Sequence, residues 1–392
     1  MSELRSGRDE YKSNSRNDLS NIHQHTSDLV IAPLYRTSVS SAEAAMRFTR
    51  IGIFFALEAA ASALPFSTPK HETTKTKYQF PNETWVENLA VQSNGKILVT
   101  LLSSPEIWEI DPTREDSAKL VHRFPHALST LGIAEVQPDI FVVAVGNITL
   151  PAIASVPGSY SAWKIDMRKH RKVQHTQPQS VSKIADLPQA HFLNGLSNLP
   201  GYPNTVLLAD SAQGVINALN ISTGTSRTYL DDPAFKPNNS ISVRSGVNGL
   251  HVHDGYLYFT NTFATPALAR IPLDGVSGEP SGSVETIVGA PSWQVNIGDQ
   301  ADDFSFDGEG NVWLATDPSN SIVKITIPGG KTAVKVGVVD GSVVAGVTAT
   351  AFGRTKSDKH VLYATTNGGI AFPPLGGVVG GKVVAIDTSR LA

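Results

Sequence analysis

Four residues with oxygen-bearing side chains stand at equivalent positions of a repeated sequence pattern. They are Glu87, Asn194, Asn248 and Asp302. Two carboxylates and two amide carbonyls that converge on one axis suit a hard cation such as Ca²⁺, with water completing its ligand shell. A cation would also relieve the repulsion between the two carboxylates. We therefore expect these residues to bind a divalent cation, Ca²⁺ first among the candidates, with a metal-free site as the alternative.

The same positions admit a second interpretation, as turn residues. Asn-Gly occurs at 194–195 and at 248–249, and this dipeptide is a strong turn signal. The pair at 302–303 is turn-like too, whereas Glu87 is not a turn residue. The other two copies of the pattern hold Leu131 and Ala345 at this position. Because turns alone do not account for four polar occupants, we favour the convergent site.

The elements that would position these residues repeat six times. One element is a β-rich strand, and its copies are 52 to 61 residues apart when aligned on Ile110, Ile165, Leu219, Ile271, Ile325 and Ile386. A second element precedes each copy and is typical of two antiparallel strands joined by a tight turn. Its copies span residues 87–100, 131–144, 194–209, 248–260, 302–315 and 345–364.

This repetition predicts an all-β fold. With one further strand, each repeat makes a four-stranded antiparallel blade, and six blades arranged radially form a six-bladed β-propeller without a long open edge. A linear β-solenoid is the structural alternative, but its repeats are usually shorter. The segment 76–82 is expected to close the ring by pairing into the last blade. The first strand of each second element would be innermost, so the four polar residues would meet at the channel mouth.

The four positions and their contexts resemble the family of senescence marker protein, gluconolactonase and luciferin-regenerating enzyme. The resemblance covers roughly 76–392 and rests on Glu87, Asn194-Gly-Leu, Asn248-Gly-Leu and Asp302 ahead of FSFDGEGNVWLA. It implies a six-bladed propeller with a central divalent metal, and lactone or ester hydrolysis with Asp302 as both ligand and base. The sequence departs from those enzymes at 87–89, where Glu-Asn-Leu replaces their Glu-Gly-Pro.

A closer resemblance involves the divergent fungal branch of this family. The segment ETWVENLAVQSNGKILVTLLSSPEIWEIDP (83–112), with a leader before it, is similar to that branch. Its members sit in secondary-metabolite pathways, and some are hetero-Diels–Alderases that join a tropolone-derived quinone methide to humulene-type terpenes. The resemblance implies cyclisation of an apolar small molecule, with Asp302, Asn194 and Asn248 as the catalytic residues.

Three further residues are candidates for binding such a substrate. Trp85 and Trp293 each precede a polar position of the repeat on the stretch that leads into the channel mouth. Aromatic walls there would suit an apolar ligand, although packing between blades is the simpler role. His191, three residues before Asn194, stands where an acid or base at the pocket rim could lie, and a solvated loop histidine is the alternative.

Two other functions stay open at this stage. In a metal-dependent lactonase or esterase, the cation would polarise the carbonyl and Asp302 would take a proton. In a non-catalytic secreted propeller, the channel would only bind a ligand. No G-x-S-x-G, Walker or H-E-x-x-H motif occurs, so serine-hydrolase, nucleotide and zinc-protease chemistry lack support.

Composition excludes several classes of partner and chemistry. The 392 residues include 32 lysines and arginines against 35 acidic residues, a net charge of −3, and no basic tract stands out, so we expect no nucleic-acid partner. The chain has no cysteine, which excludes disulfides, thiolate metal sites and a cysteine nucleophile. No obligate protein partner is evident.

The N-terminal residues have the pattern of a secretory leader inside an extension. Residues 1–45 are polar and are expected to be disordered or non-native. Residues 46–63 have a basic start, a short apolar run and an A-x-A cleavage site, with an apolar run too short to span a bilayer. We therefore expect a signal peptide at 46–63, a linker at 64–75, the propeller at 76–392, and a secretory or extracellular location. Sequons that such a location would expose to glycosylation lie at Asn82, Asn147, Asn220 and Asn238.

Overall fold

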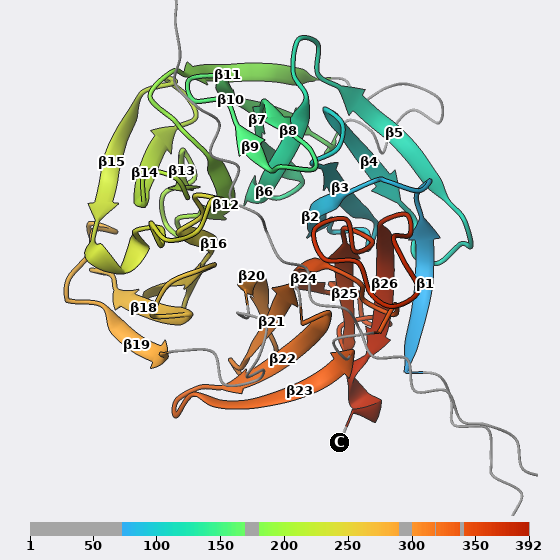
Figure 1. Cartoon of the computed structure of the whole chain (residues 1–392). Coiled ribbons are helices and arrows are strands. Elements are labelled where there is room, and N and C mark those ends of the chain that lie inside the picture. Colours follow the sequence, from blue (N-terminus) through green and yellow to red (C-terminus); the bar gives the residue numbers. More distant parts are fainter. Residues whose placement is uncertain (1–72, 169–179, 290–299, 318, 338–340, 392) are drawn as a thin grey trace, which may run out of the picture. The chain divides into compact units, whose positions relative to one another are not determined.

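The computed structural model describes residues 73–168, 180–289, 300–317, 319–337 and 341–391. Within them, six antiparallel sheets of four strands each are arranged as blades around one axis (Figure 1). The predicted six-bladed β-propeller is therefore confirmed. The expected extension, 1–45, and leader, 46–63, lie outside the described residues. No helix in the described ranges is long and apolar enough to cross a membrane.

Each blade runs from the axis outward, and the blades are numbered 1 to 6 in the order in which their innermost strands follow one another along the chain. The innermost strands are β2 (Val86–Val91), β6 (Ser129–Gln137), β12 (Leu193–Asn198), β16 (Val247–His253), β20 (Gln300–Phe306) and β24 (Val347–Phe352). The second strands are β3 (Ile97–Leu101), β7 (Ile140–Gly146), β13 (Thr205–Asp210), β17 (Tyr256–Asn261), β21 (Val312–Asp317) and β25 (Val361–Thr366). The third strands are β4 (Glu106–Ile110), β10 (Tyr160–Asp166), β14 (Val215–Asn220), β18 (Leu268–Pro272), β22 (Ser321–Thr326) and β26 (Lys382–Asp387). The outermost strands are β5 (Ala118–Arg123), β11 (Val181–Leu187), β15 (Ser226–Asp231), β19 (Glu285–Val288), β23 (Lys331–Gly337) and β1 (Thr74–Gln79).

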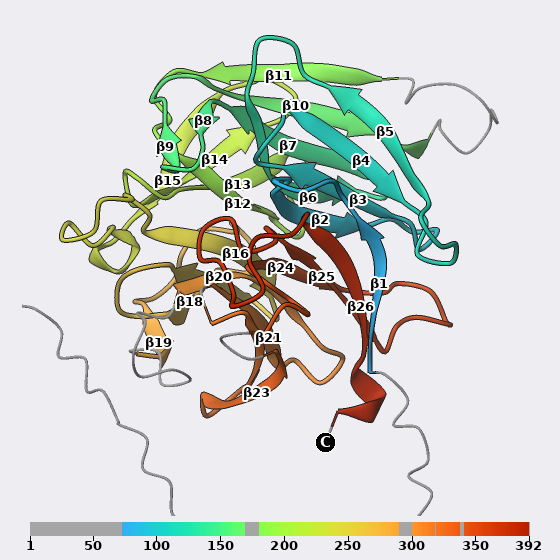
Figure 2. The same cartoon turned by 45° about the vertical axis from the view of Figure 1, so that its right-hand side comes forward.

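The first strand of the described residues completes the last blade, as predicted. β1 pairs antiparallel with β26, with Lys75 opposite Ala385 and Gln79 opposite Lys382. The two strands lie side by side in both views (Figures 1 and 2). A backbone hydrogen bond of 2.9 Å from Phe80 N to Gly381 O continues this pairing toward the axis. The ring is thus closed by hydrogen bonds between the two ends of the described chain.

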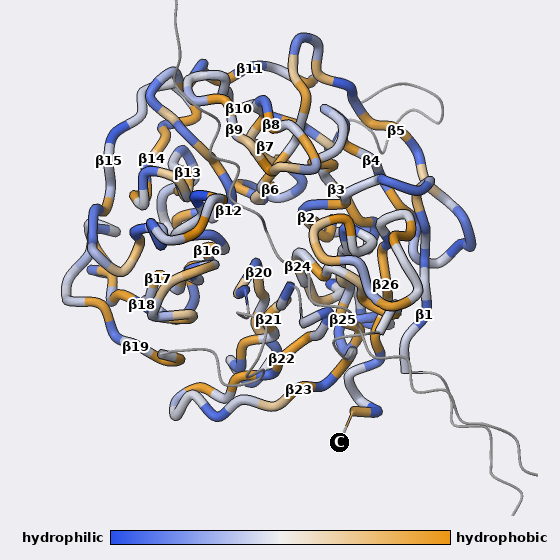
Figure 3. Tube along the Cα trace, viewed as in Figure 1, coloured by the Kyte–Doolittle hydropathy of each residue, from blue (hydrophilic) through white to orange (hydrophobic). Residues whose placement is uncertain are grey.

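Apolar residues pack between the blades. The second strands β3 and β7 are buried along their whole length, as expected for β-branched runs covered on both faces. The outer strands, such as β5, are only partly buried, and Figure 3 shows mixed hydropathy along them. Burial of each large aliphatic side chain contributes about 1.5–3 kcal/mol, so the inter-blade layers carry most of the stability.

A local break in strand pairing recurs at the start of every innermost strand. Pairing with the second strand is interrupted at Glu87 in β2, at 131–132 in β6, at 194–195 in β12, at 248–249 in β16, at 302–303 in β20 and at Thr348 in β24. We call these positions the axial bulges. A bulged residue leaves the regular alternation of the strand, so its side chain can be aimed elsewhere.

Glycines in the axial bulges allow neighbouring blades to touch through their backbones. A Cβ atom added at Gly132 would lie 2.1 Å from the carbonyl oxygen of Asn194, and one at Gly195 would lie 2.3 Å from that of Asn248. At Gly249 the added atom would lie 2.6 Å from a carboxylate oxygen of Asp303. Each distance is too short for any side chain, so these glycines are required by close approach.

The alternative interpretation of the Asn-Gly pairs as turns is excluded, and the position assigned to Ala345 is corrected. The Asn-Gly pairs at 194–195 and 248–249 lie within strands, and neither glycine has a positive φ, so they are bulges and not turns. In the sixth blade the bulge falls at Thr348, three residues after Ala345. Ala345 therefore does not belong to the set of equivalent positions, because the sixth innermost strand begins later than its sequence pattern indicates.

We expect Gly195→Ala to lower the free energy of unfolding by about 1–3 kcal/mol, since the added methyl group meets backbone of the next blade that cannot move freely. Gly308→Ala is the matched control, because nothing lies within 4 Å of the added atom there. Chemical denaturation of both variants measures the difference. Equal stability of the two variants would contradict the close contact.

Candidate functional site

The four predicted polar residues meet at one pocket on the propeller axis. Glu87, Asn194 and Asn248 are 7%, 5% and 4% exposed, and Asp302 is partly buried beside them. All four are axial-bulge residues, which explains how strands from four different blades direct side chains toward one point. The central pocket, as we name it, is lined by Trp85, Glu87, Leu102, Ile153, Phe192, Asn194, Val243, Ser245, Asn248, Thr262, Phe263, Gln300, Asp302, Asp317 and Ala371.

The pocket has a polar floor and an apolar wall. The wall is formed by Trp85, Leu102, Ile153, Phe192, Val243, Phe263 and Ala371. Space free of protein atoms amounts to about 530 Å³ with the open mouth counted, but only about 60 Å³ is open to the centres of water-sized molecules. The deep part therefore accepts one polar group of a ligand, while the bulk of a larger ligand must lie nearer the mouth.

Trp85 both lines the pocket and orients its floor. The indole Nε1 donates a hydrogen bond of 2.6 Å to Oε2 of Glu87, and the indole is only 6% exposed. The backbone N–H of Trp85 is in turn held by the Ser103 hydroxyl at 3.0 Å. One oxygen of Glu87 is thus occupied by protein, and Oε1 remains for a ligand, a proton or a cation.

The two asparagines differ in how they are held. The Asn248 amide Nδ2 donates to the Thr262 hydroxyl at 2.9 Å, and the Asn248 side chain also hydrogen-bonds Asp302. Its Oδ1 is buried and has no hydrogen-bond partner among the described residues. The Asn194 side chain makes no hydrogen bond to any other described residue, although it is nearly buried. Both amides therefore have free capacity to bind something placed in the pocket.

Burial raises the pKa of the acidic side chains on the floor. It raises the pKa of Glu87 to about 7, opposed by the Trp85 hydrogen bond and reinforced by the charges of Asp303 and Asp317. The pKa of Asp302 is raised well above its ordinary value, first by burial and then by the charge of Glu87. No lysine, arginine or histidine is among the described residues that line the pocket. Protons or a cation must therefore offset the negative charge of this floor.

Asp317 is an important member of the floor that sequence reasoning missed. It ends β21, its Oδ2 accepts a hydrogen bond of 2.8 Å from Asn367, and its Oδ1 is buried without a partner among the described residues. Burial raises its pKa to about 7. A signal existed, because polar residues also end β13 and β17, at Asp210 and Asn261. Those two side chains hold loop backbone instead, so the position alone does not identify the pocket residue.

The other predicted binding residues have different outcomes. Trp293 lies outside the described residues. His191 is exposed and lines a neighbouring groove, not the central pocket, because the turn that follows β11 directs it outward while Asp210 holds its backbone N–H at 2.8 Å. The adjacent Phe192 is the residue of this turn that enters the central pocket.

The residues of the floor fit a divalent cation, which remains a prediction. Within the described ranges, no three histidine or acidic side chains converge closely enough to hold a metal by themselves. The predicted set has only two carboxylates, however, and takes its other ligands from amide oxygens. Asn248 Oδ1 is buried and has no hydrogen-bond partner among the described residues, so this oxygen is free to coordinate a hard cation.

Asp303, next to Asp302 along β20, closes the channel beside this floor. Its carboxylate accepts a hydrogen bond of 2.8 Å from Asn88 Nδ2, and its other oxygen lies 3.0 Å from His251 Nε2. These contacts join blades 1, 4 and 5 directly across the axis. Asp303 therefore links blades structurally, and Asp302 is the residue of this bulge whose carboxyl group is available to a ligand.

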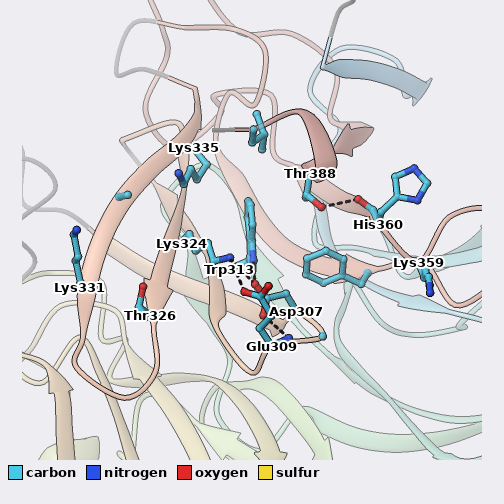
Figure 4. A pocket seen from close by; sticks show the side chains of 14 residues that line it. Asp307, Glu309, Trp313, Lys324, Thr326, Lys331, Lys335, Lys359, His360 and Thr388 are labelled. Carbon is cyan, nitrogen blue, oxygen red and sulfur yellow. Dashed lines mark hydrogen bonds and ion pairs between the residues drawn. The ribbon is translucent and has the colours of Figure 1, made fainter.

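A second large hollow lies between blades 5 and 6, away from the central pocket. This lysine groove has about 600 Å³ of water-accessible space, and Figure 4 shows Lys331 and Lys335 on one side of it and Lys359 on the other. In its middle, Trp313 and Lys324 both contact Asp307, at 3.0 Å and 2.9 Å. Its aromatic and acidic groups thus satisfy one another, unlike the unpartnered groups of the central pocket.

Two proteins of known description are similar to this chain over most of its length. A protein of Phoma sp described as a proposed hetero-Diels-Alderase is 29% identical over 351 residues, covering 82% of this chain and 96% of that protein. A protein of Sarocladium schorii with the same description is 28% identical over 364 residues, covering 84% and 86%. No protein-family model matches the chain.

Solved structures of the same architecture show the fold alone. Luciferin-regenerating enzyme superposes with a TM-score of 0.54 at 13% identity, over 80% of this chain and 94% of that one. The calcium-binding protein regucalcin of Agrobacterium tumefaciens superposes with a TM-score of 0.53 at 16% identity, over 79% and 92%. Together with the two fungal relatives, these matches confirm the resemblance predicted from the sequence.

The raised pKa values predict a pH dependence of stability. A carboxyl group whose pKa is higher in the folded state stabilises the protein below its ordinary pKa, and this contribution is lost as pH rises through the folded value. In metal-free buffer, the free energy of unfolding should therefore fall between about pH 4.5 and 7. Glu87→Gln should make this fall shallower by on the order of 1–3 kcal/mol. Urea denaturation across this range measures it.

Glu115→Gln provides the control for that measurement, because the Glu115 side chain is 83% exposed and lies outside the pocket. Its pH profile should follow that of the unmodified protein. A profile for Glu87→Gln that is parallel to the unmodified protein would show that Glu87 does not titrate in the assumed way.

A calcium titration tests the predicted cation site. At pH 8, where the floor carboxylates are ionised, saturating Ca²⁺ should raise the thermal midpoint, since a ligand at 100 times its Kd stabilises by about 2.7 kcal/mol. Asp302→Asn should abolish most of this shift, and Asp231→Asn, a change at an exposed carboxylate of β15, should leave it intact. Scanning calorimetry with Ca²⁺ and with chelator gives the answer, and an unchanged midpoint would favour the metal-free alternative.

Proposed function

We propose that this chain is a biosynthetic enzyme of fungal secondary metabolism that catalyses a hetero-Diels–Alder cyclisation in the central pocket. The observation that carries the proposal is the combination, in one small pocket, of an acidic floor whose carboxyl groups have raised pKa values with an apolar wall. The two proteins at 28–29% identity described as proposed hetero-Diels-Alderases support the reaction class. A tropolone-derived heterodiene and a terpene alkene are the substrates that the resemblance favours.

The proposed reaction needs no nucleophile and releases no atom. A conjugated C=C–C=O unit and an alkene form one C–C bond and one C–O bond, two π bonds are consumed, and the remaining π bond shifts within the new ring. The barrier falls when the two partners are held in a near-attack pose and when the carbonyl oxygen is polarised by a fixed donor. The site must therefore supply orientation and one hydrogen-bond donor, and must exclude water.

The floor can supply the donor. Because the pKa of Glu87 is about 7 and that of Asp302 is well above its ordinary value, a carboxyl group on the floor remains protonated near neutral pH. A neutral carboxyl group donates a strong hydrogen bond to a carbonyl oxygen without placing a negative charge beside it. The Asn194 amide lies on the same floor and, through its free Nδ2, would add a second donor to that oxygen.

The apolar wall can orient the two reacting partners and exclude water from them. Trp85 and Phe192 are each 6% exposed, and Leu102 is 2% exposed, so their remaining surface faces the pocket. An alkene partner that packs on this wall would lie above the polarised oxygen, with little water between them. Because the deepest space is small, the oxygen-bearing end of the heterodiene would enter first and the apolar partner would cover it.

A divalent cation, when bound, would supply Lewis-acid polarisation of the same carbonyl oxygen. Glu87, Asn194, Asn248 and Asp302 are the residues that would hold it. The expected leader would place the enzyme in the secretory pathway or outside the cell, which is part of the same proposal. Lactone hydrolysis and simple ligand binding remain distinguishable outcomes of the experiment below.

Deletion of the gene in its native host should remove one cyclised product and accumulate its uncyclised precursor or shunt adducts, as seen by mass spectrometry of extracts. Reintroduced Asp302→Leu, which has no hydrogen-bond donor, should restore product formation roughly 10²-fold less well than the unmodified gene, the usual effect of losing one transition-state donor. Asp231→Asn should restore it fully, since that carboxylate is on the exposed strand β15.

Other metabolite patterns would overturn the proposal in distinct ways. Accumulation of an intact lactone or ester would indicate a hydrolase. An unchanged profile would remove both enzymatic functions and leave a binding protein. Full restoration by Asp302→Leu would show that the cyclisation, if present, does not use Asp302 as its hydrogen-bond donor.

A further inference from the structure

A groove beside the central pocket is lined by a basic residue where the central pocket is lined by acidic ones. It offers about 550 Å³ of water-accessible space and is lined by residues that include Pro157, His191, Gln213 and Arg244. We call it the mouth groove. No aspartate or glutamate is among the described residues that line it, whereas the central pocket has three acidic residues and no basic one. The two hollows therefore attract groups of different charge.

The two hollows share a wall. Ile153 and Phe192 line both of them. Ile153 belongs to the loop of a short hairpin inserted in blade 2, β8 (Ile148–Thr149) and β9 (Ala154–Ser155), which is labelled in Figures 1 and 2. Because the same two side chains line both hollows, the deep pocket and the larger groove adjoin at this wall, and one molecule that packs on it would reach both.

Arg244 is the group of the mouth groove that could recognise a ligand. Its side chain is exposed and makes no hydrogen bond or ion pair with any other described residue. Its neighbours in the chain, Val243 and Ser245, line the central pocket. The guanidinium therefore stands at the boundary of the two hollows, with all its donors free. A planar fork of this kind is suited to the paired oxygens of a carboxylate or of a delocalised enolate.

We propose that the mouth groove is a recognition subsite for an anionic oxygen group, and that the substrate is an amphiphilic organic acid. Its acidic oxygens bind Arg244, its apolar body packs on Ile153 and Phe192, and its uncharged carbonyl end enters the central pocket. This inference rests on the proposed function for the identity of the site, and it adds the chemical class of the ligand. It also explains orientation, since Arg244 attracts the anionic end, whereas no lysine, arginine or histidine is among the described residues that line the central pocket.

A matched pair of fluorescent probes tests the subsite without the natural substrate. The anionic probe 8-anilinonaphthalene-1-sulfonate and the neutral probe N-phenyl-1-naphthylamine share one apolar body and differ in the charged group. Titrated into the full chain, Arg244→Gln should weaken binding of the anionic probe about tenfold, the effect of losing one charge-assisted contact, and change binding of the neutral probe less than twofold. Lys331→Gln, in the lysine groove, is the control and should change neither.

Every other pattern overturns the subsite. Unchanged binding of the anionic probe to Arg244→Gln, or an equal loss for both probes, would remove Arg244 as the recognition group. An equal loss in Lys331→Gln would show that the probe senses general surface charge. Failure of the proposed cyclisation would not alter these readouts, and Asp302→Asn should leave the effect of Arg244 on the anionic probe in place. The two proposals therefore fail separately.

Discussion

Backbone contact between neighbouring axial bulges determines how closely the six blades approach their common axis. Gly132 and Gly195 each bring their own blade against a carbonyl oxygen of the next one, at distances that no side chain would allow. Hydroxyl groups fix two other junctions between blades, where Thr260 donates to the Asp302 carbonyl oxygen at 2.8 Å and Thr348 donates to that of Val86 at 2.8 Å. Because the bulged residues are released from the strand ladder, their side chains can converge, and the floor of the pocket follows from this packing.

The blades and the polar floor could be predicted because both follow from the sixfold sequence repeat. Alternating strands separated by turns recur six times, and one position of the repeat collects Glu87, Asn194, Asn248 and Asp302. Ala345 was misplaced because the aligned pattern starts at residue 345, whereas the innermost strand of that blade, β24, begins at Val347. Asp317 was missed because it ends a second strand, and equivalent residues in other blades hold loops.

The rim of the site could not be read from the sequence. Phe192, Ile153 and Phe263 lie in connections that differ from blade to blade, so no periodicity points to them. The contrast between an acidic floor and a basic groove also depends on which loop folds toward which hollow. His191 and Phe192 are adjacent in the chain, yet one enters the mouth groove alone and the other enters both hollows.

Closure of the ring by β1 and β26 has a consequence for the order in which the protein can fold. A ribosome makes β1 before any other described strand, yet its partner β26 is almost the last segment to emerge, more than 300 residues later. Contacts of such long sequence separation slow folding, because a large loop must close before they form. During synthesis, five blades can each form from local hairpins, while the sixth stays incomplete. The nascent chain must therefore keep β1 unpaired and available until β26 has been made.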